Sequence, residues 1–134
     1  MKLRPHHFYC FHFASFSDPS RGKKFKAITE KRRQLFKAKE EKIEVKEGPD
    51  LLCEACPYYN GQGCAHPKGD EKAVKKWDTR ILQELGLGFG QILKVEEVKS
   101  LIREKSPLTF CLKKCPYYQE NKCNPEILPE DLKC

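Results

Sequence analysis

The feature that most constrains this chain is a cysteine motif that occurs twice. In residues 53–64 it reads Cys-x2-Cys-Pro-Tyr-Tyr, and in residues 111–123 it reads Cys-x3-Cys-Pro-Tyr-Tyr; a third cysteine follows each time. In both copies seven residues separate the second cysteine from the third. The motif cysteines are Cys53, Cys56 and Cys64 in the first copy, and Cys111, Cys115 and Cys123 in the second. Because residues three or four apart share one face of a helix, each copy can direct its thiols at one metal centre.

Two further cysteines, Cys10 and Cys134, bring the total to eight. Tetrahedral zinc and cubane iron–sulfur clusters usually take four protein ligands, so three motif cysteines plus one remote cysteine would complete each of two sites. The spacing leaves open which remote cysteine joins which copy. We expect Cys10 to complete the first copy, because it is the only cysteine that precedes it, with His6 or His7 close by. A histidine could also replace a cysteine; the candidates are His6, His7, His12 and His66.

The favoured cofactor is an iron–sulfur cluster of the 4Fe-4S type, present once or twice. Structural zinc is the main alternative. Four disulfides would be unusual in an intracellular chain, and a redox-active dithiol would not need a third cysteine at a fixed distance. We expect Tyr58 and Tyr117 to limit the access of solvent to the centres, which helps to set the potential of a cluster.

Length and composition indicate one domain, residues 1–134, in the cytoplasm. No apolar run approaches the ~20 residues that a transmembrane helix needs, so we expect no membrane association. Residues 6–16 contain several histidines and are a poor signal peptide. The formal net charge of +7 counts every cysteine as neutral, and metal-bound thiolates would reduce it. It is therefore only weak support for a nucleic-acid partner.

The pattern of apolar residues predicts a mainly α fold, with helices and irregular cysteine-rich metal-binding loops. Long helices are expected over 23–41, 70–85 and 95–105, and a short strand over 42–47. Asp50 is a suitable N-cap for a short helix over 51–56, and Gly86 is a suitable end for the helix over 70–85. Ser106 followed by proline indicates the start of another short helix, which ends at Cys115.

Several motifs together resemble domain-of-unknown-function family 1284, short cysteine-rich proteins of archaea and bacteria. The motifs are Leu-Arg-Pro-His-His-x2-Cys at 3–10, Gly-Pro-Asp-x2-Cys-x2-Cys-Pro at 48–57, Gly-Cys at 63–64, Trp-Asp at 77–78, Leu-Gly-Leu at 85–87 and the second Cys-Pro motif. The resemblance spans residue 3 to about residue 123 and implies iron–sulfur binding without implying a reaction. Cys134 lies outside these motifs.

Three functions are consistent with these residues. The favoured one is a redox or electron-transfer iron–sulfur protein, whose lysine-rich face serves an acidic redox partner. An iron–sulfur enzyme with an open cluster position would use Arg4 to bind an anionic substrate, and His6 and His7 to move protons. The alternative is a structural role, in which Arg4, His6 and His7 hydrogen-bond the thiolates or pack under a cluster. The third function is a zinc-stapled module that binds nucleic acid or protein.

Overall fold

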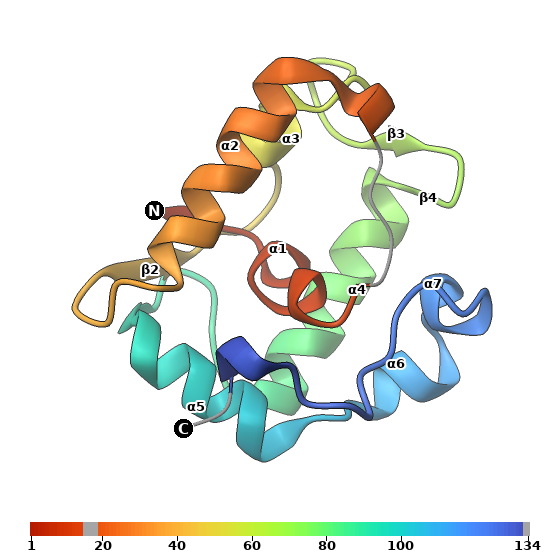
Figure 1. Ribbon diagram of the computed structural model, residues 1–134. Coiled ribbons are helices and arrows are strands. Elements are labelled where there is room, and N and C mark those ends of the chain that lie inside the picture. Colours follow the sequence, from red (N-terminus) through yellow and green to blue (C-terminus); the bar gives the residue numbers. More distant parts are fainter. Residues whose placement is uncertain (15–18, 133–134) are drawn as a thin grey trace.

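The computed structural model describes residues 1–14 and 19–132 (Figure 1), so the prediction for Cys134 lies outside the described residues. The described part is mainly helical, as expected. Its α-helices are α1 (Pro5–Tyr9), α2 (Gly22–Leu35), α3 (Leu51–Ala55), α4 (Glu71–Leu85), α5 (Val95–Lys105), α6 (Thr109–Lys113) and α7 (Pro116–Gln119). Short 3-10 turns are η1 (Cys10–His12), η2 (Pro19–Arg21) and η3 (Glu130–Leu132). None of the helices in this part is both long and apolar enough to cross a bilayer.

A small sheet anchors the beginning of the chain. Strand β2 (Lys42–Val45) lies at its centre, with β1 (Lys2–Leu3) parallel on one side and β5 (Ile92–Lys94) antiparallel on the other. Leu3 pairs with Val45, which sets the direction in which the chain enters α1. A separate hairpin joins β3 (Ala65–His66) to β4 (Gly69–Asp70), directly after the first cysteine motif.

Helix α1 lies at the centre of the molecule, with α2 and α3 above it and α4 to α7 beside and below it (Figure 1). It packs on α4, whereas α2 packs on α3. Apolar side chains from all parts of the described chain fill the interior; the fully buried ones include Leu3, Phe8, Ile43, Leu52, Ile81, Val95 and Ile102. Several side chains of the lead segment, such as Leu3 and Phe8, are thus buried in the core.

Most predicted helix boundaries are confirmed, because their caps form. The side chain of Asp50 accepts a hydrogen bond from the backbone N–H of Cys53 at the start of α3. Asp70 caps α4 in the same way, and Gly86 ends α4 in the left-handed conformation, at φ 74°. Helix α2 ends at Leu35, earlier than predicted, since the next residues form turns.

The prediction that Ser106 begins the last short helix is wrong. Ser106 ends α5, to which its backbone N–H is hydrogen-bonded, and α6 begins after Leu108. Pro116 also does more than stop a helix. It occupies the first turn of α7, where a missing N–H costs nothing. The two cysteine motifs therefore differ after their shared proline, because the first continues into a turn and a hairpin instead of a helix.

Candidate metal centre

Four thiols from opposite ends of the chain gather in one place. Cys10 begins η1, Cys111 lies in α6, Cys115 precedes α7, and Cys123 follows that helix. Each of the four interacts electrostatically with the other three. Cys111 and Cys115 are buried, while Cys10 and Cys123 are partly exposed.

Contacts of the lead segment with the C-terminal half hold this group together. The hydroxyl of Tyr9 lies 2.9 Å from that of Ser106, just before α6. Ala14 forms an isolated antiparallel bridge with Cys123, and the backbone N–H of Asn124 donates to the carbonyl of Phe13 at 3.0 Å. Backbone pairing of residues 13–14 with residues 123–124 therefore holds the segment of Cys10 beside that of Cys123.

The four-thiol group disfavours negative charge unless a cation is present. Burial, followed by the neighbouring thiols Cys111, Cys115 and Cys123, raises the pKa of Cys10 well above its usual value. Burial and adjacent thiols also raise the pKa of Cys111 to about 12 and that of Cys123 to about 11. A bound metal would reverse this preference, because thiolate is the form that ligates metal.

The distances between the cysteine sulfurs bear on the kind of metal centre that they could hold. Among the described residues, no three cysteine sulfurs lie within 4.8 Å of one another. A single tetrahedral zinc ion with Zn–S bonds of about 2.3 Å would hold its sulfurs about 3.8 Å apart. In a cubane each thiolate binds a different iron, so the four sulfurs stand farther apart. The two kinds of centre would therefore require different separations of the four sulfurs.

The expectation that Cys10 completes the first motif copy is wrong, because the structure places Cys10 with the second copy. The physical reason is the central position of α1, after which η1 turns the chain toward α6 and the segment of Cys123. Its proximity to a histidine is confirmed only through the backbone, where the N–H of Cys10 donates to the carbonyl of His6.

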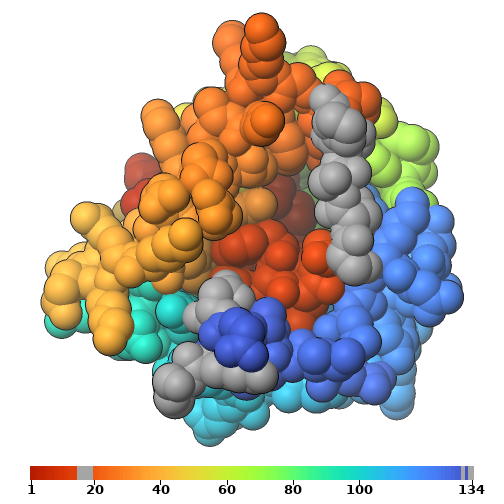
Figure 2. Space-filling model, viewed as in Figure 1, coloured from red at the N-terminus to blue at the C-terminus, as the bar shows by residue number. Residues whose placement is uncertain are grey.

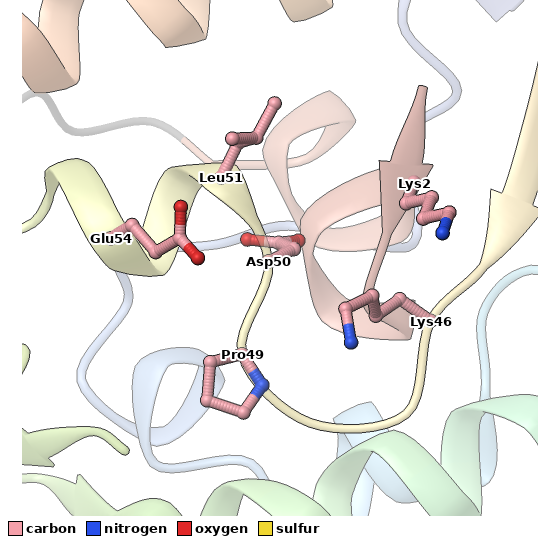
Figure 3. Close-up of a pocket in the computed structure, with 6 residues that line it drawn as sticks. All are labelled: Lys2, Lys46, Pro49, Asp50, Leu51 and Glu54. Atoms are coloured by element: carbon pink, nitrogen blue, oxygen red, sulfur yellow. The ribbon is translucent and has the colours of Figure 1, made fainter. Parts of the chain in front are cut away.

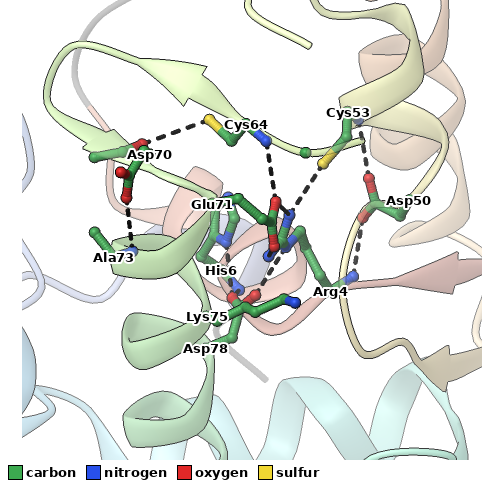
Figure 4. A network of polar contacts seen from close by, with 12 residues as sticks. Arg4, His6, Asp50, Cys53, Cys64, Asp70, Glu71, Ala73, Lys75 and Asp78 are labelled. Atoms are coloured by element: carbon green, nitrogen blue, oxygen red, sulfur yellow. Dashed lines mark hydrogen bonds and ion pairs between the residues drawn. The ribbon is translucent and has the colours of Figure 1, made fainter. Parts of the chain in front are cut away.

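The thiols of the first copy each have a different partner. The Sγ of Cys53 accepts a hydrogen bond from Arg4 at 3.4 Å, and the Sγ of Cys56 accepts one from Arg21 at 3.7 Å. The Sγ of Cys64 donates to the carbonyl of Gly69 at 3.5 Å (Figure 4). These contacts do not test whether the three sulfurs converge on one centre, so that convergence stays a prediction.

Arg4 organises a buried polar network beneath the first copy (Figure 4). Its guanidinium is fully buried and forms a bidentate pair with Glu71, at 3.0 and 2.8 Å. Its Nε donates to Asp78 at 2.8 Å, and Glu71 in turn accepts the backbone N–H of Cys64 at 3.1 Å. Because every part of this guanidinium is enclosed and paired, Arg4 is not placed to bind a substrate and has a supporting role.

His6 and His7 each pair with a buried aspartate. The Nδ1 of His6 lies 2.7 Å from Asp78, and that of His7 lies 2.8 Å from Asp50; the two rings are 4.1 Å apart. Burial, followed by the neighbouring His6, lowers the pKa of His7 to about 4. His7 is therefore neutral at pH 7, and its Nδ1–H donates to the carboxylate of Asp50.

Tyr58 and Tyr117, the two tyrosines expected to limit the access of solvent, both lie near Arg21. The ring of Tyr58 packs on that of His66 at 4.4 Å, and the guanidinium of Arg21 lies 5.4 Å from the Tyr58 ring. The ring of Tyr117 is 6.5 Å from that of Trp77, and its phenol also interacts with Arg21. Arg21 thus contacts both copies.

Sequence reasoning missed Glu71, Arg21 and the role of Asp78. The signal for Asp78 was present, because it interrupts the buried face of α4 between Val74 and Leu82. A carboxylate at such a position needs a buried cation, and Arg4 supplies it. Arg21 and Glu71 look like ordinary surface charges in the sequence and carried no comparable signal.

The fold and site define a mainly helical protein whose cysteines gather from distant segments. A family model described as "Protein of unknown function (DUF1284)" matches residues 22–123, so the chain belongs to this family. Comparison with curated proteins and with solved structures gave no match. Arg4, His6, His7 and Cys10 precede the matched residues, although they contribute to the sites described above.

Proposed function

We propose that this protein binds a 4Fe-4S cluster through Cys10, Cys111, Cys115 and Cys123, and that it transfers electrons. The observation that carries the proposal is the mutual proximity of these four thiols, which come from opposite ends of the chain. Four thiolates are the usual ligand set of such a cluster. When bound, the cluster would supply one-electron redox chemistry.

The surroundings of the four thiols support an electron-transfer role. Cys111 is buried in the same apolar core as Tyr9, Leu108 and Phe110, which limits the access of water. On the other side, Cys123 lines a shallow surface pocket together with Tyr118, Gln119 and Asn124. The red lead segment also reaches the surface, between α2 and the blue C-terminal segments (Figure 2). A cluster held here would have one edge close to a docked partner.

Helix α2 offers a face for an acidic redox partner. Its exposed cations are Lys23, Lys24, Lys26, Lys31 and Arg33, and its only acidic residue, Glu30, is already paired with Arg33. The helix lies beside the lead segment, since Arg32 donates to the carbonyl of His7 and covers the ring of Phe11 at 4.2 Å. Positive charge next to the thiol group would steer an acidic protein toward it.

Anaerobic purification followed by absorption, electron paramagnetic resonance and iron and sulfide analysis tests the cluster. We expect a brown protein that bleaches on reduction. Cys10→Ser and Cys115→Ser should lose most of the iron and sulfide, whereas Cys64→Ser, in the other copy, should keep them. A colourless protein with zinc bound to four sulfurs, or equal iron content in Cys10→Ser and wild type, would contradict the proposal.

A further inference from the structure

A second group of ligand atoms lies at the first cysteine motif, apart from the four thiols of the proposed cluster. His7, Asp50 and Cys53 each offer one ligand atom, and the three atoms lie within 4.8 Å of one another. His7 comes from α1, and the other two from the start of α3. Asp50 and Cys53 are buried, and the side chain of His7 is 16% exposed. The mixture of sulfur, nitrogen and oxygen donors differs from the all-sulfur set of the second copy.

The charge around this group favours a cation. Three carboxylates, those of Asp50, Glu71 and Asp78, line the same buried network. Arg4 pairs with two of them, and Arg32 acts on Asp50 only at longer range. The carboxylates therefore outnumber the arginines, and an added divalent ion would neutralise the excess.

The geometry leaves room for ligation. The oxygens of Asp50 accept hydrogen bonds from the backbone N–H groups of Arg4 and Cys53 and from the ring of His7. A carboxylate has about four lone-pair positions, so one remains. Asp50 also lines a surface pocket of about 300 Å³ together with Lys46, Pro49 and Leu51 (Figure 3).

We propose that the first motif copy binds a single divalent transition metal ion of the Zn²⁺ class through Cys53, His7 and Asp50. Thiolate, imidazole and carboxylate are the donors that zinc prefers, and a buried, uneven set of this kind suits a mononuclear ion rather than a cluster. On binding, the thiol of Cys53 releases one proton to solvent and its sulfur bonds to the ion, while the single ring proton of neutral His7 is carried by the nitrogen that does not face the ion. Water takes the fourth position. The ion clamps α1 onto α3.

Zinc analysis of the full-length, cluster-containing protein tests this site separately from the iron. The probe is Zn²⁺, added to protein that has been dialysed against a chelator and measured by equilibrium binding and by X-ray absorption at the zinc edge. We expect one sulfur at about 2.3 Å, with the remaining nitrogen and oxygen ligands at about 2.0 Å. Cys53→Ser and His7→Gln should weaken zinc binding by more than about tenfold, with iron and sulfide unchanged.

Matched variants keep the proposal falsifiable if one of these substitutions disturbs folding. Asp50→Asn preserves the helix cap but removes a charged ligand, so it should fold and still bind zinc more weakly. His6→Gln changes the neighbouring imidazole, which lies outside the group, and should bind zinc like wild type. Zinc with two or more sulfur ligands, or equal zinc affinity in wild type, Cys53→Ser and His7→Gln, would overturn the assignment whatever cluster the protein holds.

Discussion

The hydroxyl of Tyr9 lies 2.9 Å from the hydroxyl of Ser106, a contact that spans 97 positions of the sequence. Tyr9 directly precedes Cys10, and Ser106 stands between α5 and the helix that carries Cys111. The pair therefore ties the lead segment to the segment that supplies the other thiols of the four-thiol group.

Replacing Tyr9 with phenylalanine should loosen this tie without emptying the core. We expect Tyr9→Phe to lower the free energy of unfolding by about 1 kcal/mol, the usual net value of one hydrogen bond. Urea unfolding followed by circular dichroism measures the change. Tyr59→Phe is the control, because the Tyr59 hydroxyl donates only to the nearby carbonyl of Gly61. Equal stability of the two variants would mean that the Tyr9 contact contributes nothing.

Arg4→Lys should be strongly destabilising although it keeps the charge. Lysine carries one nitrogen, so it cannot pair with both oxygens of Glu71 while it also reaches Asp78. We expect the free energy of unfolding to fall by on the order of 3 kcal/mol, because buried carboxylates lose their partner. Arg33→Lys, at an exposed pair with Glu30, should have little effect in the same thermal melts. A wild-type melting temperature for Arg4→Lys would contradict the importance of the network.

The buried carboxylate of Asp78 should make the stability of the protein fall at acidic pH. Burial alone would raise the pKa of Asp78, but His6 and Arg4 outweigh it and hold the pKa below the usual 3.8. Its contribution is therefore present above pH 3.8 and is lost as the pH falls through the lower pKa of the folded state. We expect wild-type stability to decline steeply below about pH 4 and Asp78→Asn to decline less.

Urea unfolding between pH 7 and pH 3 measures both curves. At pH 7 Asp78→Asn should already be less stable, because Arg4 and His6 lose an ionic partner. Asp70→Asn on the same helix should match wild type at pH 7, since asparagine caps a helix about as well as aspartate. Parallel acid curves for wild type and Asp78→Asn would show that other carboxylates dominate.

Removing the metals should loosen one part of the chain. Helices α4 and α5 carry buried apolar side chains such as Ile81, Leu85 and Ile102, and need no metal to pack. Helices α6 and α7 span five and four residues, too short to persist on their own. After chelation, hydrogen exchange should accelerate over residues 109–123 while the amides of α4 stay protected. Equal acceleration of exchange in α4 and in residues 109–123, or unchanged exchange in both, would contradict this prediction.

The basic face of α2 makes a prediction about partners. With an acidic ferredoxin as electron donor, the rate of reduction of the proposed cluster should fall as salt rises. Lys23→Glu with Lys26→Glu should slow it about tenfold or more at low salt. Lys72→Glu with Lys76→Glu makes the same charge change on the exposed side of α4 and should slow it far less. Equal rates for the two double variants would remove α2 from the docking site.

Local features of the fold could be predicted from the sequence because they depend on neighbouring residues. The apolar face and the Gly86 cap define α4, and alternation of Ile43 and Val45 with charges defines β2. Strand β5 was not predicted, since Leu93 is its only buried residue and the strand exists only through its pairing with β2. Strand β1 has two residues and depends on the same sheet.

The candidate sites show the same limit. Motif spacing identified Cys111, Cys115 and Cys123 as related residues. Which motif copy Cys10 joins depends instead on the direction in which η1 turns the chain after α1, and the local sequence does not determine that direction. The burial of Arg4 could not be predicted either, because its carboxylate partners lie 67 and 74 positions away. Nothing in the local sequence distinguishes it from a surface arginine.

The position of α1 has a consequence for how the protein is made in the cell. Cys10 leaves the ribosome well before Cys111, Cys115 and Cys123, because these three cysteines lie far downstream of it in the sequence. The four thiols can meet only once Cys123 has emerged, so a cofactor that needs all of them must be delivered after that point. Until then the nascent chain would expose Cys10 and the buried aromatic residues around it to whatever chaperone or oxidant is at hand.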